Sequence, residues 1–433
     1  MHTIALIDCN NFFVSCERLF RPDLAHKPVL VLSSNDGCVV SRSEEVKILG
    51  IKMGEPYFRV KTVCEKNGVA VFSSNFDLYR DLSHRVMHTL RGFSDTVEVY
   101  SVDEAFVVPP THGTESDLQE WASTVRRTVL TDIGISVSVG VSHTKTLAKV
   151  ATHLAKQRAR SQVVELTQQK GVEVLLDQAS INAALTLTPI GEVWGIGFRQ
   201  APMLMRLGVR TAYDLTRMSD MWVRERMSVC GLRTVHELRG VSCFDVGEHA
   251  TLRKSLLHSQ SFAHTVQDFA TVHGAVVYHA RKVAEILRAE GAITREVGVL
   301  IRTSRHGSHE RYAAFESDML LLHTNDTLTL TTAVCAILAR IYKPGFPYAK
   351  AGVLVRDILP QGATPSHTFF GEREDARMPL MRTIDTLRHR YGDIIHIASE
   401  KNKKDDWHAR RQRISRGYTT SWDELATVAV RMN

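Results

Sequence analysis

The sequence VEVYSVDEAF, residues 97–106, places two adjacent acids inside a run that otherwise favours a β-strand. The β-branched and aromatic residues around them favour extended backbone, in which Asp103 and Glu104 would point to opposite faces of a sheet. A bend at residues 101–104 would instead let the two carboxylates converge. Converging carboxylates repel each other unless a divalent cation lies between them, so the stretch indicates a metal site. Taken alone, it fits a solvated hairpin tip equally well.

The composition is that of a globular protein with several domains. The chain has 433 residues, of which 44% are hydrophobic and 23% are charged, and a domain usually takes about 150 residues. Its formal net charge is +7. A basic excess of this kind favours a polyanionic partner.

The cysteines and the N-terminus indicate a cytoplasmic protein. Seven cysteines are scattered without a CxxC pair, as expected of reduced thiols. The N-terminus reaches Asp8 too early for the apolar core of a signal peptide. No run reaches the roughly 18 apolar residues that a membrane helix needs.

A third acid follows a second strand-like run. Ile4-Ala5-Leu6-Ile7 favours a buried strand that ends at Asp8. Asn10 or Asn11 can cap the helix that follows. Strands near residues 4, 97, 105 and 135 can then form one sheet covered by helices, which is an α+β arrangement. Asp8 would lie at the edge of that sheet.

Hydroxyl and basic side chains recur near these predicted elements. Ser41 ends a predicted hairpin at residues 28–42, and Lys47 lies in the short helix after it, so this pair can reach a triphosphate. A helical pattern at residues 142–156 aligns on one stripe Lys145, Lys149, Thr152 and Lys156. Beside an acidic metal site the stripe suits a triphosphate, whereas without that site it would be a solvated face.

Two further regions point to nucleic-acid binding. Gly195 and Gly197 form the turn of a predicted helical hairpin, where backbone N–H groups can approach a DNA phosphate. Residues 255–358 repeat a strand-helix-strand order twice, which is the ferredoxin-like plan. This region carries phosphate-binding candidates, namely Arg281, Lys282, Arg288, Arg295, Arg302, Arg305 and Arg311. After Pro360 the periodicity fades, and the basic stretch 401–416 is expected to be a mobile tail or a contact surface.

Four motifs together resemble those of the Y-family translesion DNA polymerases. They are DCNNFF at 8–13, SVDEA at 101–105, SHTKTLAK at 142–149 and VWGIG at 193–197. SSNDGCV at 33–39 is similar to the UmuC type in particular. The resemblance implies a multidomain α+β right-hand polymerase. It divides the chain into a palm at 1–10 and 75–165, small fingers at 11–74, a helix-hairpin-helix thumb at 166–242, a ferredoxin-like little finger at 243–358 and a partner-binding or mobile tail at 359–433.

The resemblance also implies roles for single residues. Asp8, Asp103 and Glu104 would hold two Mg²⁺ ions with help from the backbone carbonyl of Cys9, and would support nucleotidyl transfer to a primer 3′ end. Phe13 would be the steric gate, an aromatic ring that clashes with a ribose 2′-hydroxyl. The triphosphate would be bound by Ser41, Lys47 and Lys156.

The implied function is error-prone DNA-directed DNA synthesis past damaged template bases in the SOS response. The implied substrates are primer–template DNA and deoxynucleoside triphosphates, and the implied partners are a UmuD-type accessory dimer and RecA. A sliding clamp is left open, because the stretch PSHTFF at 365–370 keeps only the aromatic end of the usual clamp-binding peptide.

Two alternatives stand beside this hypothesis. A nucleotide cyclase can use a related palm with paired acids, but it would not need the hairpin at Gly195–Gly197 or the basic region after it. A non-catalytic DNA-binding relative would normally have lost the acids. All three acids, Asp8, Asp103 and Glu104, are present here.

Overall fold

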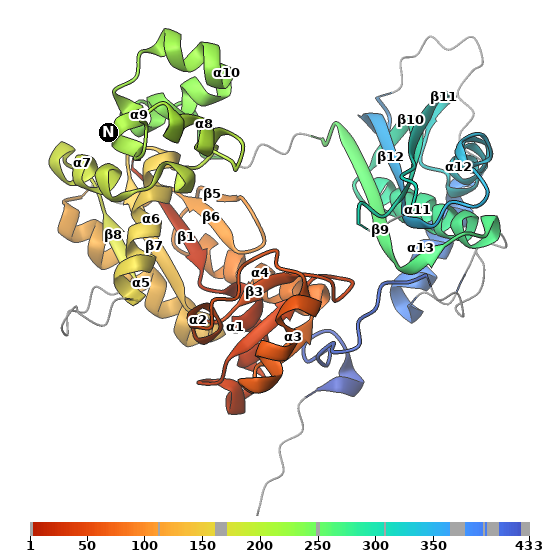
Figure 1. The fold of residues 1–433 in the computed structure, drawn as a ribbon, viewed down its shortest axis with the longest axis horizontal. Coiled ribbons are helices and arrows are strands. Elements are labelled where there is room, and N and C mark those ends of the chain that lie inside the picture. Colours follow the sequence, from red (N-terminus) through yellow and green to blue (C-terminus); the bar gives the residue numbers. More distant parts are fainter. Residues whose placement is uncertain are drawn as a thin grey trace, which may run out of the picture. The chain divides into compact units, whose positions relative to one another are not determined.

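The chain forms two compact units in the computed structural model (Figure 1). Unit 1 consists of Met1–Ser33, Cys38–His249 and Arg413–Asn433, and unit 2 consists of Ser34–Gly37 and Ala250–Gln412. The structure describes residues 3–110, 113–160, 171–247, 252–306, 309–363, 377–392, 395 and 407–425. Both units combine helices with sheets, so the predicted multidomain α+β class is confirmed.

A five-stranded sheet of order β5-β6-β1-β7-β8 forms the centre of unit 1. Its strands are β1 (Ile4–Cys9), β5 (Val97–Val99), β6 (Glu104–Val107), β7 (Val137–Ser142) and β8 (Val172–Val174). β1 is buried along its whole length and pairs antiparallel with both β6 and β7. The predicted sheet is therefore confirmed, and β8 adds a fifth strand that the sequence pattern did not predict.

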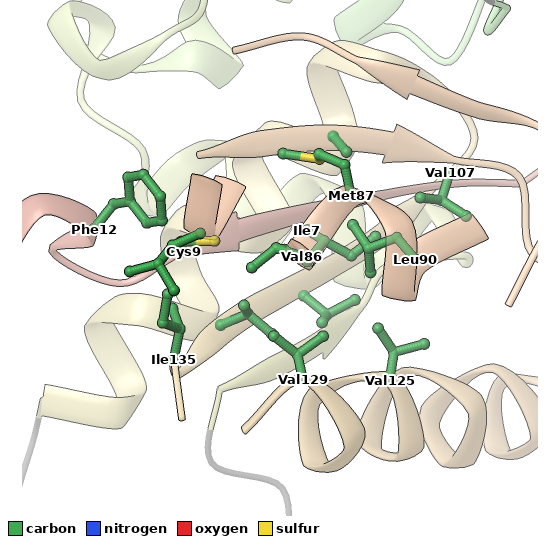
Figure 2. Packing of buried hydrophobic residues seen from close by; sticks show 14 of the residues in the cluster. Ile7, Cys9, Phe12, Val86, Met87, Leu90, Val107, Val125, Val129 and Ile135 are labelled. Carbon is green, nitrogen blue, oxygen red and sulfur yellow. The ribbon is translucent and has the colours of Figure 1, made fainter. Parts of the chain in front are cut away.

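Successive residues of β1 pack on opposite faces of this sheet, as the period of a strand requires. The odd-numbered residues share a cluster with α4 (Phe76–Arg91) and α5 (Glu115–Ile133). Figure 2 shows part of this layer, including Ile7, Val86, Leu90, Val125 and Val129. The even-numbered apolar residues pack with Ala148 of α6 (Lys145–Arg160). The parity of the strand therefore places Asp8 on the face that α6 covers.

A three-stranded sheet of order β3-β2-β4 lies in the same unit. Its elements are β2 (Val29–Leu32), β3 (Val39–Arg42), β4 (Ala70–Ser73), α2 (Glu44–Ile48) and α3 (Tyr57–Lys66), joined to β1 by α1 (Phe12–Leu19) and η1 (Pro22–Leu24). β2 and β3 pair antiparallel, which confirms the predicted hairpin. The predicted side-chain cap of α1 is wrong. Asn11 holds the N-cap position with φ 46°, but its side chain makes no capping hydrogen bond.

Five helices between residues 178 and 238 form a further part of unit 1. They are α7 (Gln178–Leu187), η2 (Ile190–Glu192), α8 (Gln200–Arg206), α9 (Ala212–Thr216) and α10 (Asp220–Leu238). Gly208, with φ 84°, lies just after α8 in the left-handed region that favours glycine. Thr211 caps α9 in a capping box with Asp214.

Unit 2 contains a four-stranded antiparallel sheet of order β11-β10-β12-β9. In chain order its elements are β9 (Ser255–Val266), α11 (Phe269–Ala289), β10 (Ala292–Thr303), β11 (Ala313–Thr324), α12 (Thr327–Ile341) and β12 (Tyr348–Pro360). The predicted β-α-β-β-α-β order is confirmed. Both helices contribute to one core with the sheet, to which Trp407 is added from the C-terminal part of the chain.

Two expectations for the second half of the chain need correction. Arg281 of α11 is fully buried and pairs with Glu285, and Arg288 binds Asp385, so neither side chain is exposed to a phosphate. The fading periodicity after Pro360 also concealed α13 (Met378–Tyr391), which is followed later by η3 (Trp422–Glu424). Among the described residues, no helix has the length and apolar character needed to cross a membrane.

Candidate active site

The acidic stretch forms a tight turn between β5 and β6. Ser101 organises it, because its Oγ donates to Asp103 Oδ1 at 2.6 Å and accepts from the backbone N–H of Glu104 at 3.1 Å. The backbone N–H of Cys9 donates to the carbonyl of Asp103 at 2.9 Å, which joins the turn to the end of β1. The bend predicted at residues 101–104 is therefore confirmed.

Asp8 and Glu104 are partners across the β1–β6 ladder. Burial, opposed by Lys156 and aided by the nearby Glu104 carboxyl, raises the pKa of Asp8 to about 7. Burial would also raise the pKa of Glu104, but hydrogen bonds from Asp8 and Lys149 lower it overall. The contact between the two carboxyls therefore favours protonation of Asp8 over protonation of Glu104.

The lysines of α6 meet these acids directly. Lys156 Nζ lies 2.5 Å from Asp8 Oδ1, and Lys149 Nζ lies 2.8 Å from Glu104 Oε2. The third lysine of the stripe, Lys145, is 2.6 Å from Glu98. The predicted basic stripe is thus one helix face, but each of its ammonium groups compensates a carboxylate of the sheet.

The nucleotide-site candidates share one cavity of about 390 Å³. Its lining includes all the residues predicted to bind a nucleotide, which are Phe13, Ser41, Lys47 and Lys156. Asp8, Cys9 and Asp103 line the same cavity. These residues come from β1, α1, β3, α2, α6 and the turn before β6, so distant parts of the sequence converge here. Glu104 does not line the cavity and reaches it only through its contact with Asp8.

The acids suit a divalent cation by their chemistry. Two carboxyl groups in contact need either a proton or a cation between them, and carboxylate oxygens are the ligands that Mg²⁺ prefers. Asp103 lines the same cavity as Asp8. In the described part of the chain, however, no group of three or more His, Cys, Asp or Glu side chains is arranged to hold a metal ion. The three acids are brought together in pairs rather than as a preformed triad.

The two adjacent phenylalanines have different environments. Both rings line the cavity, but Phe12 is 3% exposed and belongs to the core, whereas Phe13 is half-buried. The ring of Phe13 stacks on Tyr79 with centroids 4.5 Å apart and 15° between the planes. Phe76 meets the same ring edge-on at 5.9 Å. Phe13 is therefore the more exposed of the two rings that line the cavity.

Sequence reasoning missed the residue that orients Lys47. Asn11 Oδ1 accepts from Lys47 Nζ at 2.8 Å, and Asn11 Nδ2 donates to Glu44 Oε1 at 3.1 Å. Glu44 completes the group through an ion pair with Lys47 at 2.6 Å. The left-handed backbone of Asn11 turns its side chain toward α2 instead of capping α1. Arg42, also missed, lines the cavity.

The glycine turn lies close to the acidic turn. Trp194 Nε1 donates to the hydroxyl of Tyr100 at 3.0 Å, and Lys149 Nζ lies 5.5 Å from the Trp194 ring. Gly195 has φ 86°, and a Cβ there would approach Thr234 Oγ1 to 3.1 Å, so this position favours glycine. Gly197 has open space around it. Its role toward DNA stays a prediction.

Comparison with known proteins identifies the family and agrees with the fold. Residues 7–153 match the impB/mucB/samB family, residues 253–367 match its C-terminal domain, and residues 378–428 match a domain of unknown function. Protein UmuC of Salmonella typhimurium is 37% identical over 98% of this chain and 99% of its own. Protein ImpB of Salmonella typhimurium is 36% identical over 97% of this chain and 98% of its own.

More distant similarity extends to named polymerases. DNA polymerase IV of Corynebacterium diphtheriae is 29% identical over 80% of this chain and 73% of its own. Among solved structures, a Y-family DNA polymerase chimera of Dbh and Dpo4 aligns with a TM-score of 0.65 and 19% identity, over 83% of this chain and 99% of its own. That structure shares the fold. The near-complete coverage of UmuC and ImpB, together with the two matched family domains, establishes that the chain belongs to the impB/mucB/samB family.

Proposed function

We propose that the protein is an error-prone DNA-directed DNA polymerase that carries out translesion synthesis in the SOS response. The observation that carries the proposal is the single cavity that gathers Asp8 and Asp103 with Phe13, Ser41 and Lys156. Acids, an aromatic wall and cationic donors around one space are what a deoxynucleoside triphosphate requires. Relatives named UmuC and DNA polymerase IV support this assignment.

Each residue of the site has a proposed task. Asp8, Asp103 and Glu104, with the carbonyl of Cys9, would hold two Mg²⁺ ions, which activate the primer 3′-hydroxyl and neutralise the triphosphate when bound. Ser41, Lys47 and Lys156 supply hydroxyl and ammonium donors for the phosphate oxygens. Phe13 presents its half-buried ring as the wall against which a 2′-hydroxyl would clash.

The remaining regions supply DNA and partner binding in this proposal. We keep the boundaries that the sequence suggests: a palm at 1–10 and 75–165, fingers at 11–74, a thumb at 166–242, a little finger at 243–358 and a tail at 359–433. Backbone N–H groups at Gly195 and Gly197 bind a DNA phosphate. A UmuD-type dimer and RecA act as partners in the cytoplasm. The clamp-like stretch at 365–370 lies outside the described residues.

Primer extension tests the proposal. The full chain is given a primed template, deoxynucleoside triphosphates and Mg²⁺, with an undamaged or an abasic template, alone and with a UmuD-type dimer and RecA filaments. We expect Mg²⁺-dependent extension that passes the abasic site, and none from the Asp103→Ala variant. Failure to extend any template under all these conditions would overturn the proposal. A cyclic nucleotide formed from ribonucleoside triphosphates without DNA would instead favour a cyclase.

A further inference from the structure

A short C-terminal segment, Arg413–Tyr418, packs in unit 1 against β4, α1 and the start of α4. The backbone N–H of Ser73, the last residue of β4, donates to the carbonyl of Arg413 at 3.0 Å, and Arg413 N–H donates to Ser73 Oγ at 3.0 Å. Ser73 and Ile414 form a parallel bridge. The segment thus adds one bridge to the edge of the three-stranded sheet.

Side-chain contacts fix the segment further. Asn75 Nδ2 donates to Ser415 Oγ at 3.1 Å, while Asn75 Oδ1 accepts from Leu78 N–H and so caps α4. At the end of the segment, the rings of Tyr418 and Phe20 stack with centroids 4.7 Å apart. These contacts hold Ser415 against the start of the helix that carries Tyr79.

Ser415 is one end of a chain of contacts that reaches the cavity. Its Oγ donates to Glu17 Oε1 at 3.1 Å, and the same oxygen accepts from the hydroxyl of Tyr79 at 2.6 Å. The Tyr79 ring stacks on Phe13 at 4.5 Å. Glu17 is fully buried, so its carboxyl depends on these two donors for polar contact.

We propose that the segment Arg413–Tyr418 forms part of the sugar-selecting wall, with Ser415, Glu17 and Tyr79 as positioning residues for Phe13. The inference rests on the proposed function, because it takes Phe13 as the steric gate. A stacked ring transmits its own orientation to its neighbour, and Tyr79 is oriented by the hydrogen bond from its hydroxyl. That bond is made to an acceptor which Ser415 helps to hold in place.

The geometry explains why Ser415 matters to a ring it does not touch. Glu17 Oε1 receives both donors, whereas its other oxygen has no hydrogen-bond partner among the described residues. Loss of the Ser415 hydroxyl leaves Tyr79 as the single side-chain donor to a buried carboxyl. The carboxyl is then free to turn, and the Tyr79 ring turns with it. A buried carboxyl that loses one of its two donors is less well satisfied, which favours a rearrangement.

The test is sugar discrimination by the full chain. It is the ratio of kcat/KM for a deoxynucleotide to kcat/KM for the ribonucleotide of the same base, on undamaged primer–template DNA. We expect Ser415→Ala and Tyr79→Phe to lower this ratio by about 2- to 10-fold, the equivalent of one hydrogen bond. Glu17→Gln keeps an acceptor oxygen and Ser415→Thr keeps a hydroxyl donor, so both variants should retain the wild-type ratio.

Two control variants distinguish a failure of this inference from a failure of the steric-gate role proposed for Phe13. Ser421→Ala makes the same chemical change in the same part of the chain, at a residue whose backbone N–H bonds to Gly417, and should leave discrimination unchanged. Phe13→Ala should lower it. Discrimination that falls in Phe13→Ala but not in Ser415→Ala or Tyr79→Phe overturns the inference alone. Unchanged discrimination in Phe13→Ala overturns the gate and the inference together. Thermal melting of each variant excludes loss of folding.

Discussion

Asp8 lies directly across the β1–β6 ladder from Glu104, and their carboxyl groups are hydrogen-bonded to each other. In antiparallel pairing, residues that face each other across the ladder point to the same side of the sheet. The ladder therefore brings together two acids that are 96 positions apart in the sequence, and the turn at Ser101 brings Asp103 to the same cavity. Asp103 and Glu104 are catalytic candidates because the pairing of β1 with β6 places them beside Asp8.

Asp103→Asn keeps the size of the side chain and removes its charge. We expect kcat for primer extension to fall at least about 100-fold, because even changes to residues behind a metal ligand cost about 10- to 100-fold. DNA affinity, measured by fluorescence anisotropy, should change little. Ser101 Oγ can still donate to the remaining side-chain oxygen, so the turn should persist. Extension at the wild-type rate would contradict the metal assignment.

Phe13→Ala and Phe12→Ala should have different consequences. Phe13 is the more exposed of the two rings that line the cavity, so its removal should raise relative ribonucleotide incorporation by about 10- to 200-fold, the range for discrimination by shape. Phe12 is a core residue, so its removal should instead cost about 3–5 kcal/mol of stability. Steady-state incorporation and thermal melting measure the two effects. Greater ribonucleotide incorporation by a folded Phe12→Ala variant would show that Phe12, and not Phe13, is the steric gate.

Most of the fold follows from local pattern, whereas the electrostatics of the site do not. The apolar run of β1 and the helical period of α4 are readable because burial imposes them on adjacent residues. The sequence pattern predicted that the lysines of α6 lie on one helix face. Their ion pairs with acids of three different strands depend on how α6 packs on the sheet, which the local pattern does not determine. Asn11 was misjudged because its left-handed backbone directs its side chain to Lys47.

The docking of the tail was beyond the reach of sequence patterns. Glu17 and Ser415 are 398 positions apart, and neither lies in a motif. Glu17 interrupts no periodicity that would mark it as buried. A contact of this kind forms only once both surfaces are folded. The sequence therefore predicted a C-terminal tail but not the surface around Glu17 on which the tail packs.

Lys156 and Lys145 provide a matched comparison on one helix face. Lys156 lines the cavity, so Lys156→Met should raise KM for the incoming nucleotide and lower kcat. Lys145 is buried and pairs with Glu98 away from the cavity. Lys145→Met should destabilise the protein by about 3 kcal/mol, because it leaves a partly buried carboxylate without its partner. Equal effects of the two changes on KM would contradict a specific phosphate contact at Lys156.

Glu17 should make stability depend on pH. Burial raises the pKa of Glu17 from 4.5 to about 7, against hydrogen bonds from Tyr79 and Ser415 that lower it. A raised carboxyl pKa means that the folded state binds the proton more tightly, so stability falls as pH rises from about 4.5 to 7 and stays lower above it. This rise in the pKa of Glu17 corresponds to about 3 kcal/mol of stability lost at pH 8.

Glu17→Gln removes this ionisation, so it should raise the melting temperature at pH 8 relative to the wild type and have little effect at pH 5. Glu65→Gln, a change at an exposed helical position, is the control and should do neither. Calorimetry of the full chain at both pH values measures the difference. A Glu17→Gln variant that gains no stability at pH 8 would show that the buried carboxyl is not ionised there.

DNA binding should depend on the exposed arginines of unit 2 and not on the buried ones. Arg305 and Arg311 are exposed, so neutralising both to Gln should weaken binding and reduce the slope of log K against log salt by about 0.9 for each lost phosphate contact. Arg340 is exposed as well, but Glu316 and Asp318 already neutralise it, so Arg340→Gln is the matched control. Anisotropy titrations across a salt series measure all three proteins. The slope reports how many counterions the phosphate contacts release. An unchanged slope in the double variant would therefore show that Arg305 and Arg311 do not contact DNA phosphates, even if the double variant binds DNA more weakly.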